Sequence, residues 1–401
     1  MVDRWLRRFG VILLVVVAAV IISKPLGLDI PAAGDLPPGG DFGAFYGAGS
    51  IANTGDYSAL YDTGTQREMQ QFLTESDDGL FWYFSYPPIV ATVFGVFATV
   101  PFKTAAVIYT ALMLVSWLAA AWLVRPLLPK LFDRHWALVV GVSLLFWSTF
   151  KAVSGGNNTA FTVLVLVGVW RLLVAEREIT AGLVGSVLLF KPTFGVPLLL
   201  VWMLARKNRL LVGALAGAAV FGAVNTMVAG VGWLGVWIRQ AISFGNADAV
   251  LNGVSSSSFL GFAQNLTGGS RNALVIAAIG LAGVLWVAVI WLWRNESDIG
   301  TLMAFTSVVF VLGSPHAMSH EVAVSLLAVG VIVDRSSRSQ VATSLGVGVL
   351  VALSWANEWQ IEIGWSPAFA LVLAIGVATV VEGRHWVGTG KRATRNTVAP
   401  V

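Results

Sequence analysis

Residues 4–24 read RWLRRFGVILLVVVAAVIISK, a cluster of arginines followed by an uninterrupted apolar segment. This pattern resembles a secretory signal peptide, but no convincing small-residue cleavage site follows Ser23. We interpret the segment as a retained signal anchor, because basic residues beside a membrane helix stay on the cytoplasmic side. The N-terminus is therefore expected in the cytoplasm and Lys24 outside. The segment 24–86 carries nine carboxylates and two basic residues, which does not oppose its translocation.

The composition extends this interpretation to the whole chain. Of its 401 residues 57% are hydrophobic and 11% are charged, whereas roughly 25% of residues are charged in an average soluble domain. This excludes a soluble enzyme and predicts an all-α integral membrane protein. The net charge is +4, but Lys and Arg stand in short clusters between apolar segments, so no nucleic-acid binding is expected. The lack of cysteine in the sequence excludes disulfides, thiolate chemistry and Fe–S clusters.

Further apolar segments of helical length recur along the chain. They cover Thr104–Val124, Trp136–Phe150, Thr159–Ala175, Thr180–Phe190, Thr193–Ala205, Leu210–Ala229, Ala273–Trp293, Ile299–Leu312, Val322–Val333, Val341–Trp355 and Pro367–Val381. With the first segment they predict about twelve transmembrane helices. Segment 87–100 is the exception, because about fourteen residues are fewer than the roughly 17–25 that span a bilayer. Counting it as a span would place Arg125 and Arg171 outside, against the positive-inside rule. We interpret it as a re-entrant or interfacial helix on the outer face.

This topology predicts one polytopic membrane domain, residues 1–386, whose outer loop, 24–103, contains juxtamembrane helices. Residues 387–401 are expected to form a basic tail, with both termini in the cytoplasm. The polar segments between the apolar ones then face outside. They are the first loop, Lys151 to Asn158, Lys191-Pro192-Thr193, Gly230 to Arg271, Ser314 to Glu321 and Asn357 to Trp365. We therefore expect the chemistry at the outer face.

Lys191 is a candidate site residue because it separates two apolar segments that are each too short to cross a bilayer comfortably. A lysine below the membrane surface is costly unless it is paired or faces water, so it marks a functional site by default. The alternative is a single kinked span, Thr180–Ala205, in which a neighbouring helix holds Lys191 for structural reasons. Lys103, just after the interfacial helix, is a second candidate cation, and its alternative role is a membrane-surface anchor.

Asp41 follows a Pro-Pro-Gly-Gly sequence and precedes Phe42, Phe45 and Tyr46, which have helical spacing. A carboxylate at the start of a helix can act as a general base or as an N-cap. The local sequence leaves both roles open.

The segment Ser314–Glu321 contains two of the four histidines of the chain, His316 and His320, one helical turn apart. We expect His316 to contact a phosphate, with His320 or Glu321 turned to the substrate, and a capping role for the segment is the alternative. Metal binding is not expected, because no third histidine lies on the same face of the predicted topology.

A set of short motifs occurs in a fixed order along the chain. They are Gly40-Asp41-Phe42 with Tyr46, Gly55-Asp56-Tyr57, Leu60-Tyr61-Asp62, Tyr86-Pro87-Pro88, Pro101, Gly155-Gly156-Asn157-Asn158, Ala181-Gly182, Phe190-Lys191-Pro192 and Ser314-Pro315-His316. Over nearly the whole chain this set resembles glycosyltransferase family 87, the polyprenol-phosphate-mannose-dependent mannosyltransferases of the GT-C superfamily. The family commonly shows Gly-Gln where this chain has Gly156-Asn157. That departure bears on the role of Asn157 and on the identity of the sugar.

The resemblance implies a GT-C-like helical bundle that takes a sugar, mannose or a related one, from a polyprenyl-phosphate lipid outside the plasma membrane and inverts the anomeric centre. It makes Asp41 the catalytic aspartate and the Tyr-Pro-Pro segment a juxtamembrane helix. Contacts with the sugar or with a glycolipid or glycan acceptor are then expected from Tyr46, Asn157, Asn158, His320 and Glu321.

An inverting transfer needs one carboxylate to take the proton of the acceptor hydroxyl and fixed cations for the leaving phosphate. The outer-face candidates for the phosphate are Lys191, His316 and Lys103, and no cofactor is expected. Two alternative functions remain open at this stage. One is a lipid or solute transporter without chemistry, and the other is a polyprenyl-phosphate-dependent arabinosyltransferase or polysaccharide ligase.

Overall fold

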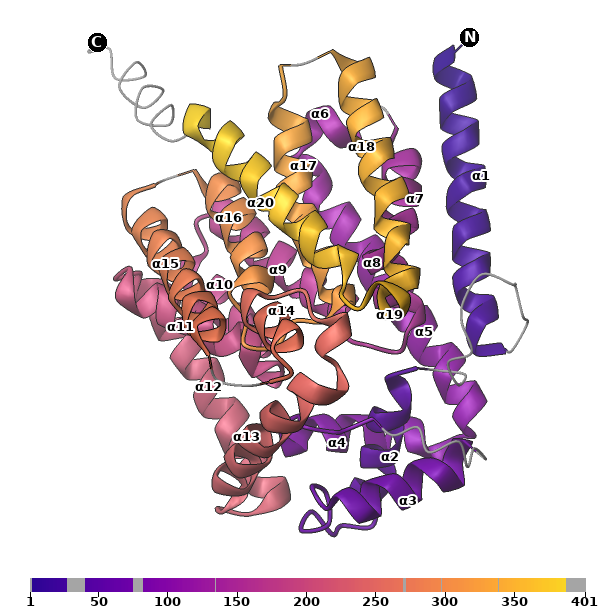
Figure 1. The fold of residues 1–401 in the computed structure, drawn as a ribbon, viewed down its shortest axis with the longest axis vertical. Helices are drawn as coiled ribbons and strands as arrows, with labels where there is room; N and C mark the ends of the chain where they lie inside the picture. The colour runs from indigo at the N-terminus through magenta and orange to yellow at the C-terminus, as the bar shows by residue number, and fades with distance from the viewer. Residues whose placement is uncertain are drawn as a thin grey trace.

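The computed structural model describes residues 2–26, 40–74, 82–133, 135–269, 272–296, 298–337 and 339–386. The predicted basic tail, 387–401, lies outside these residues. Within them the chain forms helices and connecting segments and no strand, as an all-α protein requires. Figure 1 shows that α1 begins and α20 ends at the same end of the molecule, while α2, α3, α4 and α13 lie toward the opposite end.

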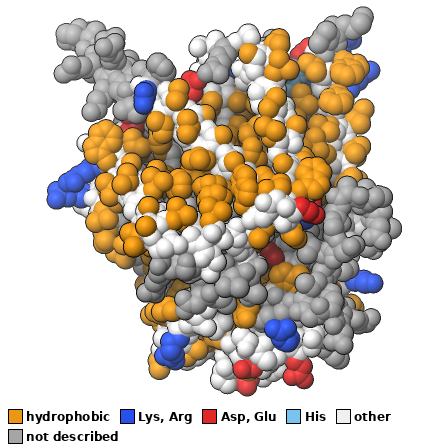
Figure 2. Space-filling view, viewed as in Figure 1, with side chains coloured by type: hydrophobic (Ala, Val, Ile, Leu, Met, Phe, Trp, Pro, Cys, Tyr) orange, Lys and Arg blue, Asp and Glu red, His pale blue; other side chains and the backbone are white. Residues whose placement is uncertain are grey.

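Six described helices are long and apolar enough to cross a membrane. They are α1 (Val2–Ser23), α5 (Phe102–Val124), α12 (Asn208–Ala229), α15 (Ala273–Asn295), α18 (Gln340–Ser354) and α20 (Pro367–Trp386), where η1 (Lys24–Leu26) extends α1, η3 (Arg125–Leu127) extends α5, and η7 (Trp355–Trp359) and α19 (Gln360–Ile363) extend α18. The chain is thus a multi-pass membrane protein. Figure 2 shows a broad band of apolar side chains across the visible face, with charged side chains chiefly toward its two ends.

Other predicted segments form helices that are shorter than a full span. They are α4 (Pro88–Gly95) with η2 (Phe97–Thr99), α9 (Thr159–Val174), α10 (Glu178–Ser186) with η4 (Val187–Phe190), α11 (Pro192–Leu204), α16 (Ile299–Leu312), and η6 (Ser319–Ser325) with α17 (Leu326–Arg335). By length, six described helices can span a membrane, or seven if one bent pair of helices is counted as a single span, against the twelve predicted from apolar segments. Glycines let short helices approach closely: a Cβ on Gly182 of α10 would lie 1.9 Å from the Leu210 carbonyl oxygen of α12.

The predicted single segment Trp136–Phe150 is broken. It forms α7 (Trp136–Leu145) and α8 (Trp147–Ser154), whose axes differ by 83°. The break is stabilised by α18 and η7, because the Trp147 N–H donates to Ser354 Oγ (2.9 Å) and Trp355 Nε1 donates to the Leu145 carbonyl (2.9 Å). In an apolar bundle a helix break persists only where its freed backbone groups find such partners.

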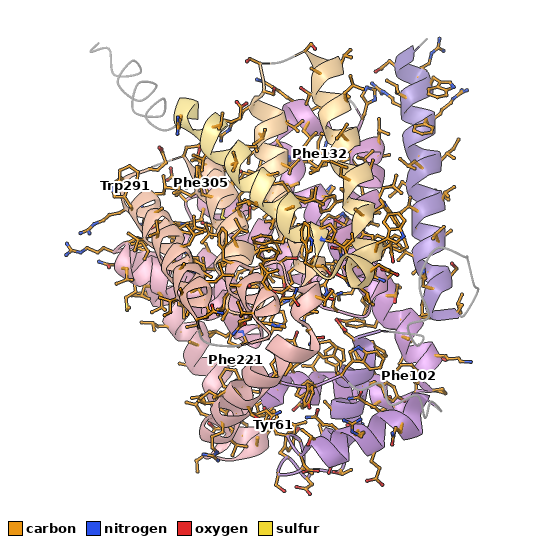
Figure 3. All side chains as sticks on the ribbon, viewed as in Figure 1. Tyr61, Phe102, Phe132, Phe221, Trp291 and Phe305 are labelled. Carbon is orange, nitrogen blue, oxygen red and sulfur yellow. The ribbon has the colours of Figure 1, made fainter. Side chains whose placement is uncertain are left out.

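The segments between the apolar ones contain helices too. The remaining elements are α2 (Phe42–Asn53), α3 (Thr63–Thr74), α6 (Pro129–Phe132), α13 (Trp233–Leu251), η5 (Gly253–Ser255) and α14 (Phe259–Leu266). Helix α4 is attached to α12, since the Ile89 N–H donates to the buried Asn225 Oδ1 at 2.8 Å. Figure 3 shows side chains filling the space between helices, with Tyr61 and Phe221 nearer the end of α2 and α13 and Phe132 nearer the opposite end.

Candidate active site

Asp41 is placed by a glycine contact between two distant segments. Its N–H donates to the Gly155 carbonyl oxygen at 3.0 Å. Gly40, with φ +52°, makes this approach possible, because a Cβ there would lie 2.5 Å from the same oxygen. The start of α2 is thus held against the turn that follows α8.

That turn, Gly155–Asn158, is built by the side chain and backbone of Asn157. Asn157 Nδ2 donates to the Lys151 carbonyl at 3.1 Å, and Asn157 Oδ1 accepts from the Thr159 N–H at 3.2 Å. The Tyr109 hydroxyl donates to the Asn157 carbonyl at 3.2 Å. Asn157 is buried, so the polar atoms that sequence reasoning assigned to a sugar are bonded to the protein itself.

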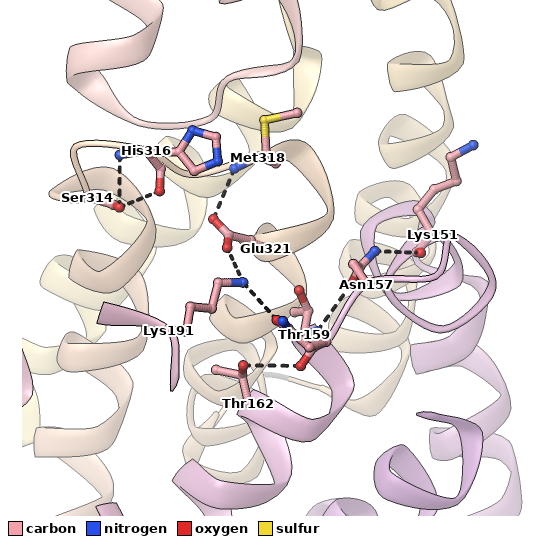
Figure 4. A network of polar contacts seen from close by, with 10 residues as sticks. Lys151, Asn157, Thr159, Thr162, Lys191, Ser314, His316, Met318 and Glu321 are labelled. Atoms are coloured by element: carbon pink, nitrogen blue, oxygen red, sulfur yellow. Dashed lines mark hydrogen bonds and ion pairs between the residues drawn. The ribbon is translucent and has the colours of Figure 1, made fainter. Parts of the chain in front are cut away.

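Lys191 lies at the junction between η4 and α11, where Pro192 starts the helix. Its ammonium group forms an ion pair with Glu321 of η6 and donates to Asn158 Oδ1 at 3.3 Å. Lys191 is 5% exposed and Glu321 1%. A buried charge is tolerated when it is paired and hydrogen bonded. The Glu321 carboxylate and the Asn158 amide oxygen meet this requirement for the Lys191 ammonium group. Figure 4 shows Lys191 directed at Glu321, with Lys151 on the other side of the Asn157–Thr159 turn.

The segment before η6 holds Glu321 and His316. The Met318 N–H donates to Glu321 Oε2 at 3.0 Å, and Ser314 Oγ donates to the His316 carbonyl at 2.6 Å. The His316 ring packs edge-on against Phe244 of α13, with centroids 5.5 Å apart. Burial lowers the pKa of His320 to about 3, and Lys191 acts in the same direction, so His320 is neutral at physiological pH. Within the described residues no group of three His, Cys, Asp or Glu side chains is arranged to hold a metal ion.

These charged groups act electrostatically on the carboxyl group of Asp41. Removal from bulk water raises the pKa of Asp41 to about 6, while Lys191, Lys151 and His316 lower it and Glu321 raises it further. The side chain makes no capping hydrogen bond to α2, so the N-cap alternative for Asp41 lacks its defining contact. A partly exposed carboxyl group with this pKa is ionised at pH 7 and can accept a proton.

Two predicted residues lie apart from this cluster. Lys103 is exposed in the first turn of α5 and is not among the charges that act on Asp41. Tyr46 is buried, and its hydroxyl donates to the Val100 carbonyl at 2.6 Å, which joins α2 to the segment after η2. Tyr46 therefore has a structural contact that its sequence position did not indicate.

Sequence reasoning missed three contributors to the site. Lys151 is one of the cations acting on Asp41, and the Tyr86 hydroxyl is hydrogen bonded to the side chain of Asn158. Tyr86 lies within the quoted Tyr-Pro-Pro motif and Lys151 begins the polar segment that ends at Asn158, so these positions in the sequence were the available signal. The third is α13, whose Trp237 Nε1 donates to the Ser85 carbonyl at 2.9 Å while Phe244 covers His316. It lies in the segment predicted as a loop.

Comparison with known families gives one result. Residues 84–315 match the family model described as Glycosyltransferase family 87. No curated protein matches the chain significantly. The matched range contains Lys151, Asn158 and Lys191, whereas Asp41 and Glu321 lie beyond its ends.

Proposed function

The chain belongs to glycosyltransferase family 87 and is therefore a glycosyltransferase, and from this premise we propose that it moves a sugar from a polyprenyl-phosphate lipid to a glycolipid or glycan acceptor with inversion. Mannose is the proposed sugar and arabinose the alternative. Membership of a glycosyltransferase family argues against the alternative of a lipid or solute transporter that catalyses no reaction. The fold is proposed to be of the GT-C type.

The observation that carries this proposal is the convergence of Asp41 with the Lys191–Glu321 pair, Lys151 and His316 from separate parts of the chain. A base beside fixed cations is the arrangement that inverting transfer from a phosphate requires.

In the proposed reaction Asp41 removes the proton of the acceptor hydroxyl as that oxygen attacks the anomeric carbon. The bond between this carbon and the phosphate oxygen breaks, and its electron pair leaves with the lipid phosphate. Lys191 and His316 are assigned to the departing phosphate. Two of the three N–H donors of Lys191 are used by Glu321 and Asn158, which fixes the third in position for this charge.

The proposed topology has about twelve membrane segments, with the termini in the cytoplasm and the active site outside the plasma membrane. One domain, residues 1–386, contains the outer loop 24–103. The shared end of α1 and α20 supports the placement of both termini on one side. In this topology α10 and η4 run from the cytoplasmic side to Lys191, and α11 runs back to the cytoplasmic side. Because these helices are short, Lys191 would lie below the outer membrane surface.

The decisive experiment uses the purified full-length protein and a radiolabelled polyprenyl-phosphate mannose. The expected products are polyprenyl phosphate and a mannosylated acceptor from a membrane-lipid extract, with inverted anomeric configuration. A polyprenyl-phosphate arabinose is tested in parallel. If the protein transfers no sugar from either donor, the proposed function is wrong. If the product keeps the anomeric configuration of the donor, the single-displacement mechanism is wrong.

A further inference from the structure

A second feature of the molecule lies along α1, apart from the Lys191–Glu321 pair. A cavity of about 230 Å³ is lined by Val16, Val17 and Val20 of α1, by Phe150 of α8 and by Trp355, with Lys24 also in its lining. The lining is almost entirely apolar and contains one charged residue, Lys24. We call this feature the α1 groove.

The far wall of the α1 groove is held by specific contacts. The rings of Phe150 and Trp355 pack with centroids 5.6 Å apart, and Trp355 Nε1 is bonded to the Leu145 carbonyl. The ammonium group of Lys24 lies over the Phe150 ring at 5.8 Å from its centroid. The groove therefore has defined walls and a defined cationic position.

The bilayer can reach this groove. Val16, which lines it, is 53% exposed, and the neighbouring Val15 is 61% exposed. In a membrane these side chains of α1 face lipid chains. A lipid in the groove would place an acyl chain along the valines and its headgroup at Lys24, at the end of the helix.

We propose that the α1 groove binds one anionic phospholipid of the surrounding bilayer, with the acyl chain along α1 and the phosphate headgroup at Lys24. The charge of Lys24 at the end of an apolar channel is complementary to that ligand. The sugar donor is a poorer fit, because its phosphate is assigned to Lys191 and His316, beside the acceptor hydroxyl that Asp41 deprotonates. Lys24 is not among the charges that act on Asp41, whereas Lys191, Lys151 and His316 are.

Occupancy of the groove has a consequence for the active site. Phe150 contacts the lipid chain, and the next residue, Lys151, acts electrostatically on Asp41. A bound acyl chain would therefore hold α8 at its observed angle to α7. The proposal concerns a lipid that is not consumed, so it stands independently of the transfer reaction.

The test measures lipid retention and not sugar transfer. The full-length protein is reconstituted with equal amounts of phosphatidylglycerol and phosphatidylcholine, extracted in mild detergent and analysed by native mass spectrometry. The wild type is expected to retain phosphatidylglycerol preferentially. Lys24→Gln should lower that preference about five-fold, the effect of one basic residue near an anionic lipid. Val16→Trp should fill the groove and reduce retention of both lipids.

Each variant has a matched control. Lys130→Gln removes an exposed lysine of α6, and Val15→Trp adds the same ring to α1 outside the groove lining. Both controls should retain lipid as the wild type does. Equal retention by Lys24→Gln, Val16→Trp and their controls would overturn the proposal. Added polyprenyl phosphate that displaces phosphatidylglycerol through the same residues would also overturn it and make the groove a carrier-lipid site.

Discussion

Asp41→Asn tests the central assignment, because the substitution changes proton affinity and little else. The amide is nearly isosteric with the carboxyl group. No capping hydrogen bond is lost, since the Asp41 side chain makes none to α2. A general base supplies roughly 100-fold to 10,000-fold in rate. We expect a loss of that size in sugar transfer by Asp41→Asn, with binding of the donor lipid unchanged because the cations remain.

The pH dependence gives this prediction a second measure. With the pKa of Asp41 raised to about 6 by its removal from water, about nine-tenths of the carboxyl groups are ionised at pH 7 and about one-tenth at pH 5. Transfer at limiting donor should therefore fall about ten-fold between pH 7 and pH 5 in the wild type. The residual rate of Asp41→Asn should show no such step.

Asp41→Asn should lower the rate of transfer without lowering the stability of the fold. A carboxyl group whose folded pKa lies above its unfolded value of 3.8 stabilises the fold while it is protonated, and this contribution is lost as the pH rises through about 6. Asn cannot ionise, so Asp41→Asn is expected to be at least as resistant to thermal unfolding at pH 7 as the wild type. A lower unfolding temperature would indicate a structural contact for Asp41.

Transfer by Asp41→Asn at the wild-type rate, with the step near pH 6 intact, would refute the assignment. Two other carboxylates of segment 24–103, Asp56 and Asp62, are poor substitutes. Asp56 accepts hydrogen bonds from the Ser58 side chain and backbone, and Asp62 accepts from Thr65; these bonds lower both pKa values. Glu321, already paired with Lys191, would then be the next carboxylate to test.

Three other perturbations test the surrounding structure. Lys191→Met leaves Glu321 buried without its cation and should lower stability by roughly 3–5 kcal/mol. The double variant Lys191→Met/Glu321→Gln should recover most of that stability but should not transfer sugar. Thermal unfolding and sugar transfer are measured on the same samples. Full transfer by the double variant would limit Lys191 to a structural role. Gly40→Ala should reduce transfer, because its φ of +52° and the 2.5 Å approach of a Cβ to a facing carbonyl displace the base; wild-type transfer would contradict this. In a chain without cysteine, a cysteine at Lys103 should react with an impermeant reagent on intact cells and one at Arg209 should not, and the reverse pattern would invert the proposed topology.

The apolar segments of the sequence were sufficient to predict most helices. Segment Ala273–Trp293 corresponds to α15 (Ala273–Asn295), and Ile299–Leu312 is α16 with the same bounds. Apolar composition dictates helix formation in a membrane because the backbone must bond internally. It does not dictate how far a short helix crosses, which is why only six of the twelve predicted spans, or seven with the bent pair α7 and α8, have full length among the described residues.

The features that the sequence did not predict depend on distant partners. The residue at the break between α7 and α8 is Phe146, so no Pro or Gly marks the break in the sequence. The Trp147 N–H and the Leu145 carbonyl at the break are hydrogen bonded to Ser354 and Trp355. The partner of Lys191 is likewise Glu321. Both residues were candidates from local pattern, but the pattern could not show that they form a pair.

The interruptions between helices supply the residues of the candidate site. Asp41 precedes α2, Asn158 precedes α9, Lys191 separates η4 from α11, and Glu321 lies in the 3-10 helix η6. Polar residues occur at such points because a break inside an apolar bundle must be satisfied by side chains. Asn158 and Glu321 bond to Lys191, whereas the Asp41 carboxylate accepts no hydrogen bond from any described residue. A carboxylate that is left unbonded beside fixed cations is available to accept a proton from a substrate, which is why Asp41 is assigned as the base.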